Sequence, residues 1–112
     1  MTDCIFCKIL RGEIPSSKVY EDELIYAFND IAPMAPVHVL IIPREHIESA
    51  ARIAPEHASL LGHIWTVIPQ IAKQQSLTDF RVVTNAGADA GQTVAHLHFH
   101  LLGGKTMGTS LA

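Results

Sequence analysis

The chain has 112 residues, of which 48% are hydrophobic and 17% are charged, and its formal net charge is −3 at pH 7. These values are typical of one soluble globular domain over residues 1–112, and the acidic balance argues against nucleic-acid binding through phosphate contacts. The sequence contains no signal-peptide pattern and no apolar run of roughly 20 residues, so we expect a cytoplasmic protein that does not enter a membrane.

The N-terminal part of the chain predicts a short helix followed by three strands. The helix or turn covers residues 4–11, and short strands over 19–21 and 24–29 flank an acidic turn. The segment 37–42 is β-branched and almost entirely apolar until Pro43, which is typical of a central, buried strand.

One long helix is predicted over residues 55–75. Pro55 suits the first helical turn, where its missing N–H has no cost, and apolar residues then recur at helical spacing. Pro69 lies inside this pattern and should kink or divide the helix.

Two further strands are predicted over 80–85 and 95–102, joined by a glycine-containing loop. Strands, then a helix, then a hairpin of strands favour an α+β domain rather than a parallel α/β fold. We therefore expect an antiparallel five-stranded meander sheet with one long helix and a short N-terminal helix.

Three histidines, His96, His98 and His100, alternate with apolar residues in the last predicted strand. A period of two places them on one face, about 6.5 Å apart, with the apolar residues directed to the core. Two chemistries need several imidazoles on one face. One is a zinc site with three His ligands and an open water position; the other is nucleophilic attack by one neutral imidazole while its neighbours position the transferred group.

The loop before this strand favours phosphate as the group transferred. Its glycines, Gly87 and Gly91, would let backbone N–H groups approach an anion closely. Asn85, Gln92 and Thr93 could add side-chain donors. The loop is not a Walker loop, because no Gly-Lys-Ser/Thr sequence follows it.

The pair Cys4-x-x-Cys7 has metal-ligand spacing but alone is ambiguous among zinc, a redox dithiol and two buried thiols. The βαβ context of a thioredoxin-type site is missing. His46, just after the predicted central strand, is the third candidate ligand.

The segment 96–102 fits the pattern His-φ-His-φ-His-φ-φ, where φ is apolar, and resembles the histidine-triad family. The flanking Gly91-Gln92-Thr93-Val94 and Gly103-Gly104 resemble its Hint branch, the histidine-triad nucleotide-binding proteins. The similarity extends to residues 4–9, 13–15, 28–31 and 36–43, and so to almost the whole chain.

This resemblance implies a homodimer whose sheets join across the interface, and hydrolysis of purine nucleoside phosphoramidates or transfer of the nucleotidyl group. His98 would be the nucleophile that forms a covalent nucleotidyl-histidine, from which water releases the nucleoside monophosphate. His100, His38 and Thr93 would complete the catalytic group. The implied nucleotide-binding residues, with Asp30 on the ribose, are Phe6, Ile9, Ile14, Phe28, Asp30, Ile31, Asn85, Gly91, Gln92, Thr93, His98 and His100.

The resemblance also implies a structural zinc ion and no catalytic metal. Its ligands would be Cys4, Cys7, His46 and His96. The histidine strand would then divide, with His96 on the metal, His98 in covalent chemistry and His100 on the phosphate.

Three alternatives remain open at this level. Thr93 stands where the Hint branch often has serine, and Gly-Gln-Thr-Val also resembles the branch of dinucleoside polyphosphate hydrolases. A zinc hydrolase would use all three strand histidines. A nucleotide-binding regulatory protein would use the same polar groups without turnover.

Overall fold

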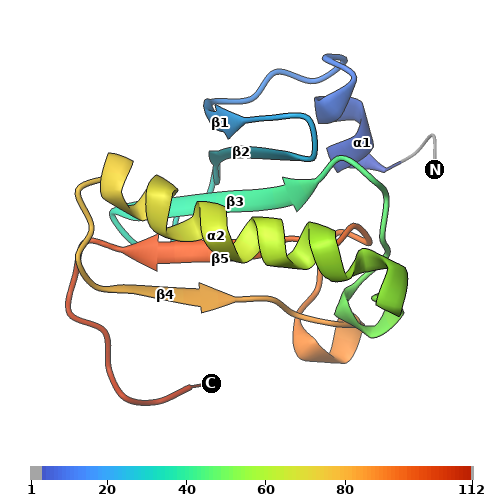
Figure 1. Ribbon diagram of the computed structural model, residues 1–112. Coiled ribbons are helices and arrows are strands. Elements are labelled where there is room, and N and C mark those ends of the chain that lie inside the picture. The colour runs from blue at the N-terminus through green and yellow to red at the C-terminus, as the bar shows by residue number, and fades with distance from the viewer. Residues whose placement is uncertain (1–3, 112) are drawn as a thin grey trace.

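The fold is described from a computed structural model of residues 4–111 (Figure 1); residues 1–3 and 112 of the expected domain lie outside the described residues. In chain order the helices and strands are α1 (Ile5–Leu10), β1 (Lys18–Glu21), β2 (Ile25–Asn29), β3 (Val37–Pro43), α2 (Ala58–Gln74), β4 (Phe80–Val83) and β5 (Phe99–Gly103). Short 3-10 turns lie at Ala50–Arg52, Pro55–His57 and Ala88–Ala90.

The strands form one antiparallel five-stranded sheet in the order β1-β2-β3-β5-β4. The predicted α+β class, the five antiparallel strands and both helices are confirmed. The order corrects one feature, because only β1, β2 and β3 form a meander. After β3 the chain crosses one face of the sheet as α2 and returns at the outer edge as β4, and β5 then fills the place between β3 and β4 (Figure 1).

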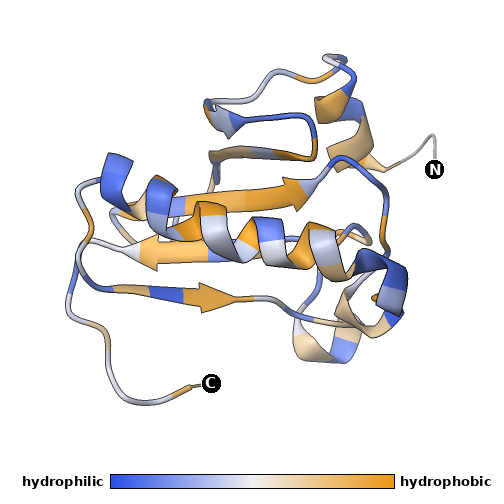
Figure 2. Cartoon of the chain, in the orientation of Figure 1, coloured by the Kyte–Doolittle hydropathy of each residue, from blue (hydrophilic) through white to orange (hydrophobic). Residues whose placement is uncertain are grey.

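The core lies between α2 and the sheet face that this helix crosses. Ala27, Ile41 and Phe99 are paired across β2, β3 and β5, so their side chains share this face. In Figure 2 the hydrophobic colour runs along β3 and β5 beneath the helix. The buried stripe of α2 that packs on them is Ile64, Val67, Ile68, Ile71 and Ala72. Each fully buried isoleucine contributes about 1.5–3 kcal/mol relative to an exposed one.

The opposite face of the sheet carries the histidines and is partly covered by α1. Phe28, Leu40 and His100 are paired across β2, β3 and β5 and therefore share this second face. Phe6 of α1 packs edge-on against Phe28, with ring centroids 5.6 Å apart. This smaller cluster, which includes Leu40 and Ile42, anchors α1 to β2 and β3.

Two predicted element boundaries were wrong. The last strand was expected over 95–102 but begins at Phe99, and His96 lies at a bend before it. β4 ends at Val83, because the hydroxyl of Thr84 donates to the backbone oxygen of His98 over 2.7 Å at the point where a strand ladder would continue. The alternation itself holds, since Leu97, Phe99 and Leu101 are all buried in the core under α2.

The long helix is continuous, so the predicted division at Pro69 does not occur. Its first expected turn, Pro55–His57, is a 3-10 turn, and α2 then runs from Ala58 to Gln74. Pro69 lies on the exposed side of the helix, where the carbonyl group that loses its partner can be hydrated. No helix in the described part of the chain is both long and apolar enough to span a membrane.

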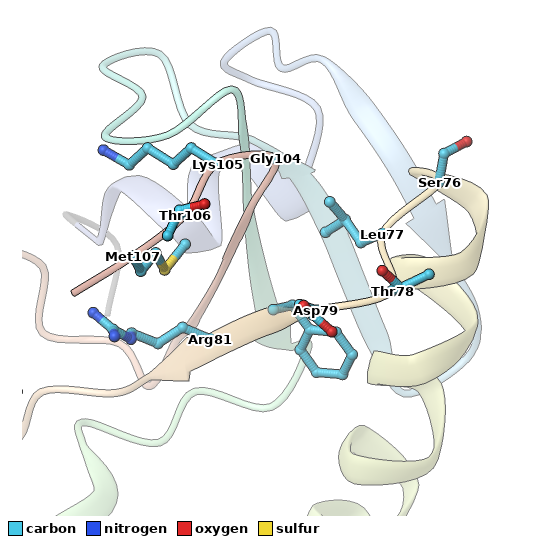
Figure 3. Close-up of a pocket in the computed structure, with 10 residues that line it drawn as sticks. Ser76, Leu77, Thr78, Asp79, Arg81, Gly104, Lys105, Thr106 and Met107 are labelled. Carbon is cyan, nitrogen blue, oxygen red and sulfur yellow. The ribbon is translucent and has the colours of Figure 1, made fainter. Parts of the chain in front are cut away.

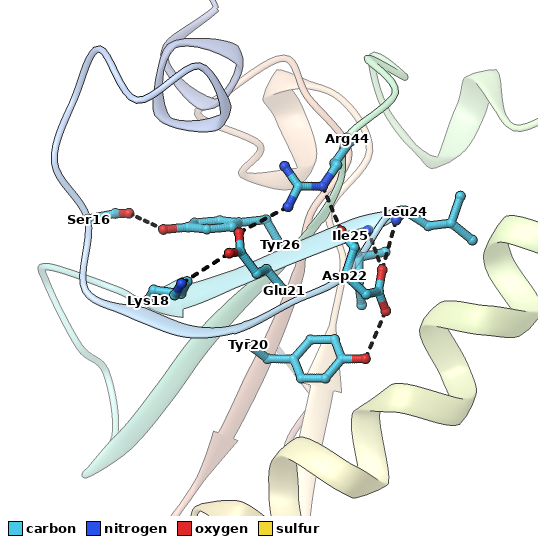
Figure 4. Close-up of polar contacts among 9 residues, drawn as sticks. All are labelled: Ser16, Lys18, Tyr20, Glu21, Asp22, Leu24, Ile25, Tyr26 and Arg44. Atoms are coloured by element: carbon cyan, nitrogen blue, oxygen red, sulfur yellow. Dashed lines mark hydrogen bonds and ion pairs between the residues drawn. The ribbon is translucent and has the colours of Figure 1, made fainter.

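The turn between β1 and β2 is built around the carboxylate of Asp22 (Figure 4). Its Oδ1 accepts from the backbone N–H groups of Leu24 and Ile25, and its Oδ2 accepts from the hydroxyl of Tyr20 over 2.8 Å. His63 of α2 brings Nε2 to 2.6 Å from the same Oδ2. Burial alone would raise the pKa of Asp22, but these hydrogen bonds outweigh it and lower the pKa to about 2. The contact between Asp22 and His63 thus connects the turn between β1 and β2 to α2.

Candidate active site and metal centre

The strand register brings His38 and His100 together on the face opposite α2. Leu40 of β3 is paired with His100 of β5, and His38 is paired with Leu102. The two histidines are therefore diagonal neighbours on adjacent strands, with ring centroids 5.1 Å apart. The ring of His98 lies 5.1 Å from that of His100 and completes a row of three imidazoles.

His98 is held in one orientation by its own segment of backbone. Its Nδ1 lies 2.7 Å from the carbonyl oxygen of His96, and only 5% of the residue is exposed. A carbonyl can only accept, so Nδ1 carries the proton and Nε2 of the neutral ring keeps its lone pair. The edge of Phe6 packs against the ring, with centroids 5.1 Å apart. This is the arrangement that an imidazole nucleophile needs.

A chain of hydrogen bonds sets the proton positions of the other two rings. The backbone N–H of Met34 donates to Nδ1 of His38 over 3.0 Å, so the proton of neutral His38 is on Nε2. That Nε2–H donates to Nδ1 of His100 over 2.8 Å. His100 therefore carries its own proton on Nε2, as a donor toward an anion.

The environment keeps these rings neutral. Burial lowers the pKa of His38, although the nearby carboxylate of Asp30, whose Oδ2 is 3.4 Å from His38 Nε2, acts in the opposite direction. Burial, assisted by His98 and His38, lowers the pKa of His100 to about 4. At neutral pH His100 is thus a neutral hydrogen-bond donor, as the chain from Met34 requires.

The residues expected to contact a nucleoside are brought together only in part. Phe6, Phe28 and Ile9 belong to one apolar cluster beside the histidines. Ile14 is half-buried outside that cluster, and the side chain of Ile31 is 99% exposed. The carboxylate of Asp30 accepts from the N–H of Ala32 through Oδ1, which leaves Oδ2 directed toward His38.

In the loop between β4 and β5, the side chain of Gln92, which was expected to contact the phosphate, bonds to backbone groups of the protein. Its Nε2 donates to the carbonyl oxygens of Glu48 and Val94, and its Oε1 accepts from the N–H of Gly87. Thr93 is exposed and Asn85 half-buried, so both remain accessible to a ligand. Gly91 has φ of +94°, a conformation that favours glycine.

Cys4, Cys7, His46 and His96 form a second cluster, in which all four ligand atoms lie within 4.8 Å of one another. Nδ1 of His96 lies 3.4 Å from Sγ of Cys4 and 3.6 Å from Sγ of Cys7. Nδ1 of His46 lies 3.3 Å from Sγ of Cys7 and 3.2 Å from Nδ1 of His96. The structure thus brings together the four residues that the sequence singled out.

These distances match a tetrahedral zinc site. Zn–S bonds of about 2.3 Å and Zn–N bonds of about 2.05 Å at tetrahedral angles give separations of about 3.6 Å for S···N and about 3.3 Å for N···N. The remaining nitrogen of His96, Nε2, lies 2.9 Å from the carbonyl oxygen of Pro43, which fixes Nδ1 as the ligating atom. The donor set and the geometry therefore fit zinc.

His96 cannot share one ion with His98 and His100 in this arrangement. Both of its ring nitrogens are directed elsewhere, one to the cysteines and one to Pro43. The 2.8 Å contact between His38 and His100 is a hydrogen-bond distance, shorter than the separation of two nitrogens on a tetrahedral ion. The geometry therefore gives no support to a zinc hydrolase built on three strand histidines.

Some contacts could not be anticipated from the sequence. The N–H of Met34 orients His38, and the carbonyl of Pro43 orients His96. Both act through backbone atoms, which leave no residue-type signal in the sequence.

Two cavities were also not predicted. One of about 550 Å³ lies between the end of α2, β4 and the C-terminal tail (Figure 3). The other, of about 410 Å³, is lined by Cys4, Ile5, His46, Glu48, Thr93, Val94 and Ala95.

Comparison with known proteins identifies the family. Residues 3–111 match the family described as "Scavenger mRNA decapping enzyme C-term binding". The chain is also 51% identical to a HIT-like protein of Synechococcus elongatus, over 94% of this chain and 93% of that protein. The chain belongs to the histidine-triad (HIT) family. Within it, the chain is 45% identical to the purine nucleoside phosphoramidase of Escherichia coli, over 98% of this chain and 94% of that enzyme. The structure of a HIT family hydrolase from Clostridium thermocellum has a TM-score of 0.97 and 46% identity, covering 100% of this chain and 99% of that one.

Proposed function

We propose that the protein hydrolyses the P–N bond of purine nucleoside 5′-phosphoramidates through a covalent nucleotidyl-histidine at His98. The observation that carries the proposal is the 2.7 Å contact between Nδ1 of His98 and the carbonyl of His96, which leaves Nε2 as a buried, oriented nucleophile. The 45% identity to the Escherichia coli phosphoramidase supports the choice of substrate.

In the first step Nε2 of His98 attacks the α-phosphorus and forms a bond to it, while the bond from phosphorus to the departing nitrogen breaks and that nitrogen takes up a proton from solvent water. The Nδ1–H group keeps its hydrogen bond to the carbonyl of His96, and this carbonyl oxygen stabilises the positive charge that develops on the ring. In the second step water attacks the phosphorus, the bond between phosphorus and Nε2 breaks, and the nucleoside monophosphate leaves as one proton of that water passes to solvent. His98 then returns to its original state.

His100 would stabilise the negative charge that develops on the phosphoryl oxygens. Its Nε2–H is a donor because Nδ1 is already occupied by His38, and it can act without becoming charged. Asn85, Thr93 and the N–H groups around Gly91 would supply further donors. Oδ2 of Asp30 would take the ribose hydroxyls beside the aromatic pair Phe6 and Phe28.

The proposal includes a structural zinc ion on Cys4, Cys7, His46 and His96. When bound, it would join the start of α1 to the segments before the histidine row and stabilise the fold. It has no role in bond cleavage. Cysteines that ligate zinc instead of forming a disulfide suit a reducing compartment such as the cytoplasm.

The proposal also includes a homodimer. Among the described strands β4 pairs only with β5, so its other edge can pair with the same strand of a second copy. Phe80 of β4 is 41% exposed, and Trp65, whose ring packs on Phe99 of the neighbouring β5, is 50% exposed, so both offer apolar surface to a partner. Sedimentation of the protein at several concentrations tests this part of the proposal.

The decisive experiment is to trap the intermediate. Rapid quenching of the protein with an adenosine phosphoramidate labelled in the α-phosphate should leave label on the wild-type chain and none on His98→Ala. This variant should lose more than about a thousandfold in kcat and keep AMP affinity within about threefold. Label on His98→Ala, or residual activity near wild type, would remove His98 from the mechanism.

The same preparation tests the rival substrate. We expect faster turnover of the phosphoramidate than of diadenosine triphosphate. The reverse order would indicate a dinucleoside polyphosphate hydrolase, and AMP binding without turnover of either compound would indicate a regulatory nucleotide-binding protein.

A further inference from the structure

The side-chain amide of Gln92 joins three separate stretches of backbone. Its Nε2 donates to the carbonyl oxygens of Glu48 and Val94 over 2.8 and 2.9 Å, and its Oε1 accepts from the N–H of Gly87 over 2.8 Å. Exchanging the nitrogen and oxygen would set an oxygen against two carbonyl oxygens, so the partners determine the orientation of the amide. Both N–H groups of the side chain are therefore committed within the protein.

Two of the three joined stretches carry members of the metal cluster. Glu48 follows His46 by two residues, and Val94 precedes His96 by two. These two stretches also meet directly, because the N–H of Leu97 donates to the carbonyl of Ile47 over 2.6 Å. The metal cluster and the anchor points of Gln92 therefore belong to one connected unit.

The third stretch is the loop that we expect to face the phosphate. Gly87 bonds to Gln92 in both directions, since its carbonyl also accepts from the backbone N–H of Gln92 over 3.1 Å. These two bonds close the segment 87–92 around the turn Ala88–Ala90. The position of the loop relative to the metal cluster thus depends on the amide of Gln92.

We propose that Gln92 is a positioning residue that couples the metal cluster to the phosphate loop, and that it does not contact the phosphate. The inference rests on the proposed function for the role of the loop. A metal ion that fixes the stretches of His46 and His96 also fixes Glu48 and Val94, and Gln92 transmits this order to Gly87. Because coupling between two sites is reciprocal in binding free energy, a ligand on the loop must in turn tighten binding of the metal.

The coupling can be measured on the zinc-loaded protein without any turnover. Competition with a chromogenic chelator at equilibrium gives the zinc Kd with and without saturating AMP. We expect AMP to lower the zinc Kd about fivefold or more in the wild type, and less than about twofold in Gln92→Met, which has similar size but no hydrogen-bond donor. Gln70→Met is the matched control, because Gln70 is exposed on α2 and makes only a 3.5 Å contact to Thr66; it should behave as wild type.

An equal effect of AMP in wild type and Gln92→Met, or no effect in the wild type, overturns the inference. Gln92→Glu covers the case in which Gln92→Met does not fold. It keeps an acceptor for Gly87 but presents carboxylate oxygen to the carbonyls of Glu48 and Val94, and it should lose the coupling in the same way. Hydrogen exchange of the unaltered protein adds a test of the contact itself, since rapid exchange of the Gly87 amide would exclude it.

Failure of the proposed function gives a different result. A protein that binds AMP and shows the coupling but cleaves no phosphoramidate contradicts the proposed reaction and leaves the role of Gln92 intact. If AMP does not bind, the proposed nucleotide site is wrong, and inorganic phosphate is then the probe for the loop, with the same expected and contrary outcomes.

Discussion

His38 donates from Nε2 to Nδ1 of His100 over 2.8 Å, and the direction of this bond is set by a backbone group, the N–H of Met34. Two side chains on neighbouring strands thereby fix which nitrogen of His100 carries a proton. In the proposed reaction His38 would therefore be a positioning residue that acts on the ligand through His100.

The first prediction concerns this pair. Replacing His38 with leucine removes the donor, so His100 can populate its other tautomer, and kcat should fall about 10-fold with little change in KM. Replacing His38 with glutamine keeps an N–H donor and should restore part of the loss. The ¹⁵N chemical shifts of His100 should show the tautomer change in His38→Leu. Equal losses in both variants, with unchanged shifts, would show that His38 only fills space.

The second prediction concerns stability against pH. The pKa of His100 is lowered from its ordinary value of 6.5 to about 4, so the folded state binds fewer protons than the unfolded state between these values. The free energy of unfolding should therefore decrease as pH falls from 6.5 to 4, and this group should cause no further decrease below pH 4. Urea denaturation of wild type and His100→Asn at several pH values measures the difference. Because any acid effect on the metal cluster is common to both proteins, identical slopes would contradict the assignment.

The third prediction concerns Asp22 and a lower pH window. Its pKa is about 2 in the folded protein against an ordinary value of 3.8, so its stabilisation is complete above 3.8 and is lost as pH falls toward 2. Asp22→Asn should lower the free energy of unfolding at pH 7 by about 2 kcal/mol and should flatten its dependence on pH below 3.8. Glu23→Gln, the exposed neighbour in the same turn, is the control and should change stability by less than about 0.5 kcal/mol.

The fourth prediction concerns the metal cluster. Protein purified without a histidine tag should contain about one equivalent of zinc per chain, and Cys7→Ser should lose most of it. Removing the metal with a chelator should lower the midpoint of thermal unfolding by more than about 5 °C, because the ion joins distant segments. His57→Ala, outside the cluster, should keep its zinc. A content below a tenth of an equivalent in the wild type would end this proposal.

Periodicity and spacing predicted much of this arrangement. The alternation from His96 to His100 correctly separated the core residues of β5 from the histidines, and the four metal ligands that the family resemblance implied do converge. The period of two could not show that His96 lies outside the strand, because the bend is imposed by contacts of its ring with the cysteines and Pro43.

The features that sequence reasoning missed depend on long-range pairing or on backbone atoms. The place of β5 between β3 and β4 is decided by the path of α2 across the sheet, which no local pattern encodes. An amide at position 92 suits a phosphate contact and a structural contact equally well. The bonds of this amide to Glu48 and Gly87 become visible only in the folded chain.

The late position of β5 in the chain also bears on how the protein forms during synthesis. The strand that bears His100 is the last to be made, yet it occupies a place inside the sheet between two earlier strands. Until residue 103 has left the ribosome, β3 and β4 have no common neighbour and their facing edges stay unpaired. Completion of the sheet and assembly of the imidazole row are therefore a single, late event. A chain that ends before β5 exposes strand edges that can pair with other chains, and it has no row of three imidazoles.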